Sequence, residues 1–166
     1  MNGAQTLWWR QARSDFDMYA TLPLGGASRC HHLHYLQMTT EKLSKAYLWR
    51  TGKPPPKSHI GFVPFVRAIV DCNDLQRIAL VLGFANSVGL EKWAKGALPL
   101  AHSLQSLAHT EAKGGPNPEY PWPHHAPAYC PVDYNFTLWD RLIDTAQGRK
   151  MLVVIEHAIN RFDQIA

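Results

Sequence analysis

The stretch TTEKLSKAYLWRTGKPPPKSHIGF, residues 39–62, contains a helical pattern that runs directly into three prolines. Residues spaced three and four positions apart lie on one face of an α-helix, and around this stretch the apolar and small ones are Leu36, Thr40, Leu43 and Tyr47. Glu41 and Lys45 are four residues apart on another side, which is the spacing of an ion pair within a helix. The stretch therefore predicts an amphipathic helix with one face in a core and a second, charged face, followed by a proline turn.

Helical spacing continues through most of the chain. We expect helices over residues 5–21, before LPLGG, over residues 30–51, and over residues 58–70 with Ser58 as the N-cap. Asp74 is positioned to cap LQRIALVLGFANSVGLEKWA, in which Gly83 and Gly89 favour a break or bend. Later helical faces comprise Ala101, Leu104, Leu107 and Ala108, and then Leu152, Ile155, Ile159 and Phe162. No segment alternates as a strand does, so the pattern predicts an all-α, up-and-down helical bundle.

One segment, residues 114–131, departs from the helical pattern. Its sequence GGPNPEYPWPHHAPAYCP contains six prolines, which are incompatible with a regular helix. Tyr120, Trp122 and Tyr129 alternate with these prolines, whereas a flexible linker is polar. We therefore expect a Pro-rich strap that packs aromatic side chains onto the bundle before the C-terminal helices, with a binding loop as the alternative.

Composition fits one globular domain over residues 1–166. The chain has 46% hydrophobic and 18% charged residues, and a formal net charge of +4 permits an anionic partner such as RNA or a nucleotide. Its three cysteines form no CxxC pair, and neither a leader peptide nor a membrane-spanning apolar run is seen. These features predict a cytoplasmic protein that has no membrane partner.

Two segments together resemble a known family. The residues RSDFDMYATL in the first expected helix, followed by HYLQMTTEKLSKAYLWRTGKPPPKSH, are similar to HEPN domains, the higher eukaryote and prokaryote nucleotide-binding helical bundles. The resemblance covers residues 8–70, and beyond them only helical segments match. Its signature positions here are Gln37, Glu41, Lys42, Lys45, Ala46, Leu48, Gly52, Pro55 and His59.

The resemblance implies one of two functions. HEPN proteins include non-catalytic partners of nucleotidyltransferases, and also metal-independent ribonucleases that carry an Arg, four to six residues and then a His on a late helix. In this chain Arg149 and His157 have seven residues between them, which turns them about 80° apart on a helix. Arg29 and His34 have four, but they stand at the start of the second expected helix. We therefore expect a non-catalytic nucleotide or nucleic-acid binding module, with a toxin-like endoribonuclease of a toxin–antitoxin system, or an interaction scaffold, as the alternatives.

The charged face of residues 39–62 is the expected ligand or partner surface. Its candidate residues are Lys42, Lys45, Arg50, Lys57 and His59, although a solvated helix face with an internal Glu41–Lys45 pair explains the same pattern.

No cofactor motif is present, since the chain contains no Gly-rich phosphate loop, GxSxG or HExxH. Two clusters raise the question of a metal, but neither has the paired spacing of zinc ligands, so we expect none. These clusters are Cys30, His31, His32 and His34, and His124, His125 and Cys130.

A homodimer is also expected, since HEPN proteins assemble their sites between protomers. The C-terminal helix carries apolar residues outside its expected core stripe, and such residues favour burial against a second protomer. They are Met151, Val153, Val154 and Ala158.

Overall fold

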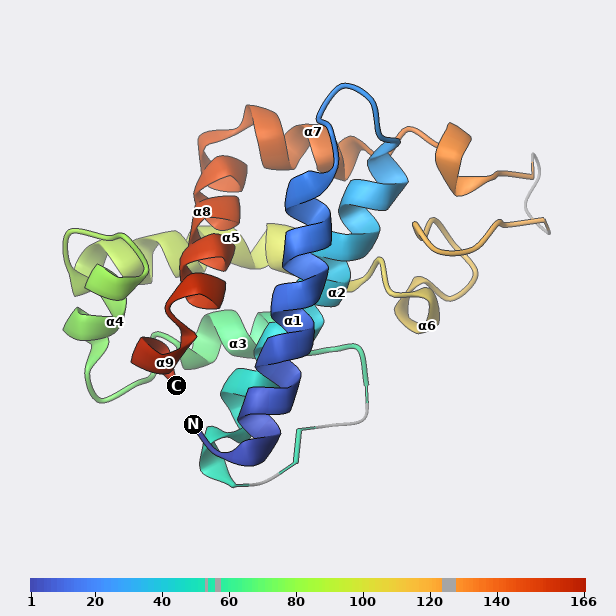
Figure 1. Ribbon diagram of the computed structural model, residues 1–166. Helices are drawn as coiled ribbons and strands as arrows, with labels where there is room; N and C mark the ends of the chain where they lie inside the picture. Colours follow the sequence, from blue (N-terminus) through green and yellow to red (C-terminus); the bar gives the residue numbers. More distant parts are fainter. Residues whose placement is uncertain (53, 56–57, 124–127) are drawn as a thin grey trace.

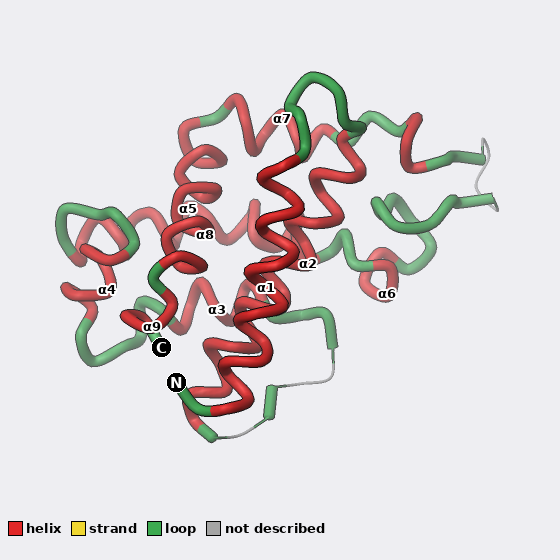
Figure 2. Tube along the Cα trace, in the orientation of Figure 1, coloured by secondary structure: helices red, strands yellow, loops and turns green. Residues whose placement is uncertain are grey.

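The computed structural model describes residues 1–52, 54–55, 58–123 and 128–166. Within these ranges the chain forms helices joined by turns and contains no strand, which confirms the predicted all-α bundle (Figures 1 and 2). The only bridge of β type in the described part is isolated and joins Trp122 and Tyr129.

Helices α1 (Gly3–Thr21) and α2 (Arg29–Leu48) lie side by side and run in opposite directions (Figure 1). A capping box at Asn2 begins α1, because the Asn2 side chain accepts from the Gln5 N–H while the Gln5 side chain accepts from the Asn2 N–H. Helix α2 is the central element of the fold, and even its polar residues are mostly buried. A short 3₁₀ turn, η1 (Trp49–Thr51), extends it to Gly52, whose φ of 73° is left-handed.

The remaining helices follow α2 along the chain. In chain order they are α3 (Phe62–Ala68), α4 (Leu75–Val81), α5 (Ser87–Gln105), α6 (His109–Ala112), the 3₁₀ turn η2 (Pro131–Asp133), α7 (Thr137–Asp144), α8 (Ala146–Asn160) and α9 (Phe162–Ile165). Helices α3 and α5 pack against each other and both contact α2, while α8 contacts α1, α2, α5 and α7. The Asp74 cap of α4 is confirmed, and Gly83, with a φ of 81°, separates α4 from α5, whereas Gly89 lies inside α5.

The predicted start of the third helix is wrong. Helix α3 begins at Phe62 after the N-cap Gly61, and Ser58 lies in a bend. Gly61 is pressed against α2, because a Cβ atom there would lie 2.9 Å from Cβ of Ser44. The chain therefore crosses the surface of α2 before it turns into α3, and this crossing brings His59 next to α2.

Helix α8 buries more of its surface within the chain than its periodicity predicts. Met151, Val154 and Ala158 are each at most 1% exposed, and of the four extra apolar residues only Val153 is exposed. The other three face neighbouring helices of the same chain, so the prediction that they need a second protomer as cover is wrong. The homodimer itself stays a prediction.

The described part of the Pro-rich segment projects to one side of the bundle, beside α6 (Figure 1). Trp122 is 3% exposed and packs against Tyr134 and Phe136, so one of the three predicted aromatic contacts with the core is confirmed. The other two, Tyr120 and Tyr129, are 49% and 41% exposed. The Tyr129 ring nevertheless contacts those of Trp122 and Tyr134, whereas the Tyr120 ring meets that of His109 on α6.

Within the described residues, no helix combines the length and the apolar character needed to cross a membrane.

Candidate functional site

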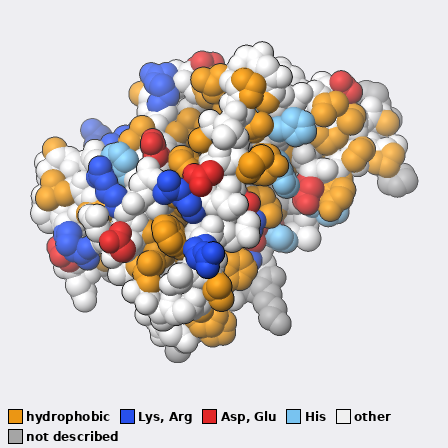
Figure 3. All heavy atoms as spheres, viewed as in Figure 1, with side chains coloured by type: hydrophobic (Ala, Val, Ile, Leu, Met, Phe, Trp, Pro, Cys, Tyr) orange, Lys and Arg blue, Asp and Glu red, His pale blue; other side chains and the backbone are white. Residues whose placement is uncertain are grey.

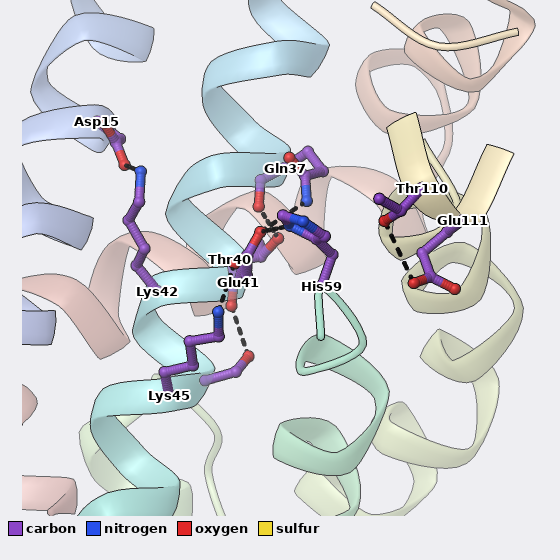
Figure 4. A network of polar contacts seen from close by, with 10 residues as sticks. Asp15, Gln37, Thr40, Glu41, Lys42, Lys45, His59, Thr110 and Glu111 are labelled. Carbon is purple, nitrogen blue, oxygen red and sulfur yellow. Dashed lines mark hydrogen bonds and ion pairs between the residues drawn. The ribbon is translucent and has the colours of Figure 1, made fainter. Parts of the chain in front are cut away.

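A cluster of polar side chains is centred on Glu41 in the middle of α2 (Figure 4). The Glu41 side chain is 6% exposed, and its carboxylate accepts hydrogen bonds from Lys45 Nζ at 2.7 Å, His59 Nδ1 at 2.7 Å and Gln37 Nε2 at 3.3 Å. We call these four residues the Glu41 cluster. A buried carboxylate that receives two cationic or strongly polar donors is stable only because each of its oxygens is satisfied.

The electrostatics of the cluster keep Glu41 ionised. Burial acts to raise the pKa of Glu41, but the hydrogen bonds and charges of Lys45 and His59 outweigh burial and lower the pKa. Because the carboxylate is the acceptor, Nδ1 of His59 is the donor. Nε2 of His59 has no hydrogen-bond partner within the described residues, and the His59 side chain is 44% exposed. The cluster therefore fixes the partly exposed His59 ring through Nδ1 and leaves Nε2 unpaired within the described part of the chain.

Two features of the sequence build the cluster. Gln37, Glu41 and Lys45 follow one another at intervals of four on α2, so they lie on one face of the helix. The predicted Glu41–Lys45 pair is thereby confirmed. His59 comes from the segment after the prolines and reaches Glu41 because Gly61 allows the backbone to approach Ser44 closely.

The charged face of α2 is less exposed than a solvated or ligand-binding surface would be. Lys42 Nζ lies 2.5 Å from a carboxylate oxygen of Asp15 on α1, and each side chain is 12% exposed. The Lys45 side chain is also 12% exposed and its Nζ lies 4.8 Å from the centre of the Trp8 ring. The interpretation of Lys42 and Lys45 as exposed cations is wrong, because α1 packs against this face of α2 and supplies Asp15 and Trp8.

The other predicted ligand-binding residues have different surroundings. Arg50 is exposed, with its guanidinium carbon 4.0 Å from the centre of the Tyr47 ring. Lys57 lies outside the described residues. Of the five predicted residues, His59 and Arg50 are thus those whose described side chains reach solvent.

Arg29 and His34 are not brought together by any contact in the structure. Arg29 donates to Asp140 at 2.7 Å and also to Asn135, so its guanidinium joins the start of α2 to α7 and the residues before it. His34 is half-buried and its ring meets that of Tyr35. Burial lowers the pKa of His34, although the nearby Glu119 acts in the opposite direction.

Arg149 and His157 also serve separate contacts. Arg149 donates to the carbonyls of Ile143 and Asp144, the last two residues of α7, at 3.1 and 2.8 Å. His157 packs against Gly83, where a Cβ atom would lie 2.7 Å from the imidazole ring. Eight residues of helix separate the two by about 12 Å along the axis of α8. Neither predicted Arg–His pair therefore forms a shared site in the structure.

Within the described residues, no three His, Cys, Asp or Glu side chains come together in a way that could hold a metal ion. Cys30 and His32 are both 1% exposed, whereas Cys130 is exposed. His124 and His125 lie outside the described residues.

Two contacts of the site carried no local signal in the sequence. Asp15 pairs with Lys42 across 27 positions, and His59 pairs with Glu41 across 18. The residues involved were within the segments of the family resemblance, but their pairing depends on how α1 and the segment before α3 pack on α2.

Comparison with protein-family models, curated proteins and solved structures finds no match to this chain.

Proposed function

We propose that the protein is a HEPN-like binding module for a nucleotide or nucleic acid, acting as the non-catalytic partner of a nucleotidyltransferase-type system. The observation that carries the proposal is the Glu41 cluster. Burying a charged network generally stabilises a fold less than apolar packing of the same volume, so such networks are often kept for another role. Here the network holds the partly exposed His59 ring through its Nδ1 and leaves Nε2 without a partner in the described residues.

The residues expected to contact a ligand in this proposal are His59, beside the middle of α2, and Arg50, in the turn that follows α2. Lys42 and Lys45 are neutralised by Asp15 and Glu41, so they support the surface rather than contact a ligand directly. His59 offers one hydrogen-bonding nitrogen, and Arg50 offers a guanidinium that can contact phosphate. The nucleotidyltransferase partner rests on the family resemblance alone.

The non-catalytic assignment is supported by the contacts of the two Arg–His pairs. Arg29 and Arg149 each donate to other groups of the protein, and no contact in the described residues brings either guanidinium to the histidine of its pair. We therefore expect purified protein to leave single-stranded RNA intact in metal-free buffer.

Fluorescence polarisation with labelled single-stranded RNA and with labelled ATP tests the proposal. We expect both His59→Ala and Arg50→Ala to weaken binding, and the double variant to weaken it about tenfold, equivalent to about 1.4 kcal/mol. The salt dependence of binding should also decrease in the variants that contain Arg50→Ala. His102→Ala and Lys92→Ala, both at exposed positions of α5, are the matched controls and should bind as the wild type does.

The proposal would be contradicted if the protein bound neither the RNA nor the ATP. It would also be contradicted if the double variant and the wild type bound with equal affinity. Cleavage of the RNA that is lost in His34→Ala or His157→Ala would favour the ribonuclease instead.

A further inference from the structure

A cavity of about 350 Å³ opens between α3 and α5, which pack side by side. Its floor is apolar and consists of Val66 and Val70 from the α3 side and Ala94 and Leu98 from α5. Val66 and Ala94 are 0% and 4% exposed, so the floor belongs to the packed core and is not a loose surface depression. The volume is within the range of small-molecule sites, which are typically about 300–1,000 Å³.

The rim of the cavity carries two charges of each sign. These are Arg67 and Asp71 on the α3 side, and Glu91 and Lys95 on α5. All four are exposed, and none makes a hydrogen bond or an ion pair to a described residue. Arg67 on α3, Asp71 after it, and Glu91 and Lys95 on α5 therefore line the same apolar floor without a described partner.

The spacing of the two charges on α5 makes their lack of pairing informative. Glu91 and Lys95 are four residues apart within one helix, the spacing at which opposite charges can pair, whereas Asp71 lies beyond the end of α3. At the same spacing elsewhere in the chain, Arg13 and Asp17 meet at 2.9 Å and Glu41 and Lys45 meet at 2.7 Å. The rim charges are thus available to a ligand that brings both a negative and a positive group.

We propose that this cavity binds a small zwitterion with an apolar body, and that an apolar α-amino acid is its ligand class. The apolar side chain occupies the floor, where it covers the partly exposed Val70 and Leu98. The carboxylate faces Arg67 and Lys95, and the ammonium group faces Asp71 and Glu91. This site is independent of the Glu41 cluster, so it holds whether or not the proposed function does.

Isothermal titration calorimetry at neutral pH with L-phenylalanine, using the whole chain, tests the proposal. Three analogues each lack one feature: hydrocinnamic acid lacks the amine, phenethylamine lacks the carboxylate and glycine lacks the apolar body. We expect L-phenylalanine to bind and each analogue to bind at least about tenfold more weakly. Failure of L-phenylalanine and L-leucine to bind at about 10 mM would overturn the proposal.

Two double variants locate the binding. Arg67→Gln with Lys95→Gln, and Asp71→Asn with Glu91→Gln, change only exposed side chains, so both proteins should fold normally. Each should weaken L-phenylalanine binding at least about tenfold, whereas the control Lys92→Gln on the same helix should not. Unchanged affinity for L-phenylalanine in both double variants would overturn the location of the site. Equally tight binding of hydrocinnamic acid, which lacks the amine, would overturn its preference for a zwitterion.

Discussion

The Lys42–Asp15 ion pair shows how burial changes the contribution of a charged side chain to stability. Both side chains are 12% exposed, and Gln11 also donates to the Asp15 carboxylate. Exposed ion pairs contribute little to stability, because water and salt screen them. In a buried pair, removal of one partner leaves the other charge without compensation in a poorly solvated place.

We therefore predict an asymmetry between single and double variants at this pair. Asp15→Ala should lower the free energy of unfolding by about 2 kcal/mol, whereas Asp15→Leu combined with Lys42→Met should cost less than about 1 kcal/mol. Urea unfolding measures both. Asp17→Ala is the control on the same helix, since the Arg13–Asp17 pair is exposed and should contribute under about 0.5 kcal/mol. A double variant less stable than Asp15→Ala would contradict this account.

At the scale of elements, α7 and α8 approach closely at Gly148. Gly148 is buried in the first turn of α8, where the Thr145 side chain accepts from its N–H. A Cβ atom at Gly148 would lie 2.5 Å from Cα of Leu142 and would also meet the backbone carbonyl of Arg141. Backbone atoms cannot move aside as a flexible side chain can, so only glycine fits here.

Gly148→Ala should consequently destabilise the protein by about 3 kcal/mol, because α7 and α8 must separate to admit the methyl group. Gly96→Ala is the matched control within a helix: its nearest neighbour would be the Gln147 side chain at 3.5 Å. Since alanine favours a helix more than glycine does, we expect Gly96→Ala to stabilise by about 0.5 kcal/mol. Thermal unfolding that places both variants at the wild-type midpoint would show that the two helices do not constrain each other.

At the scale of the whole molecule, several buried ionisable groups make stability depend on pH in the same direction. His32 is 1% exposed and stacks on Trp139, with ring centres 4.4 Å apart, and neither of its nitrogens has a hydrogen-bond partner of good geometry in the described part of the chain. Burial lowers its pKa from the ordinary 6.5, although the Pro23 carbonyl opposes the change. The pKa of His34 is also lowered by burial. An unfolded chain therefore binds more protons than the folded one just below pH 6.5.

The sign of the effect follows from this difference in protons. Stability is at its full value above the unfolded histidine pKa near 6.5 and falls as pH drops toward the lower folded values. At more acidic pH, Glu41 adds a loss of the same sign, because its folded pKa lies below its ordinary 4.5 and protonation removes its contacts.

We predict a lower urea midpoint at pH 5.5 than at pH 7.5, and a smaller difference in His32→Phe, which keeps an aromatic ring against Trp139 and does not titrate. The exposed His102→Gln should retain the wild-type difference. If His32→Phe showed the same pH dependence as the wild type, His32 would not be a source of it.

The sequence by itself determined the helical class, the Asp74 cap and the Glu41–Lys45 pair. Each depends on residues within about one turn of one another, and helical periodicity and capping are local properties of the chain. The same locality explains why the core stripe of this helix was predicted correctly, since Leu36, Leu43 and Tyr47 are all at most 1% exposed.

Only the tertiary structure decided which charges are free and which apolar residues are covered. Lys42 is neutralised by a carboxylate 27 residues away, His59 is held by Glu41 across a turn, and Met151, Val154 and Ala158 are buried by other helices of the same chain. Periodicity identifies the faces of a helix, but it does not specify which neighbour packs on each face. That choice depends on how all the helices fill the core together, because the burial of every face is set by packing between segments that are distant in the sequence.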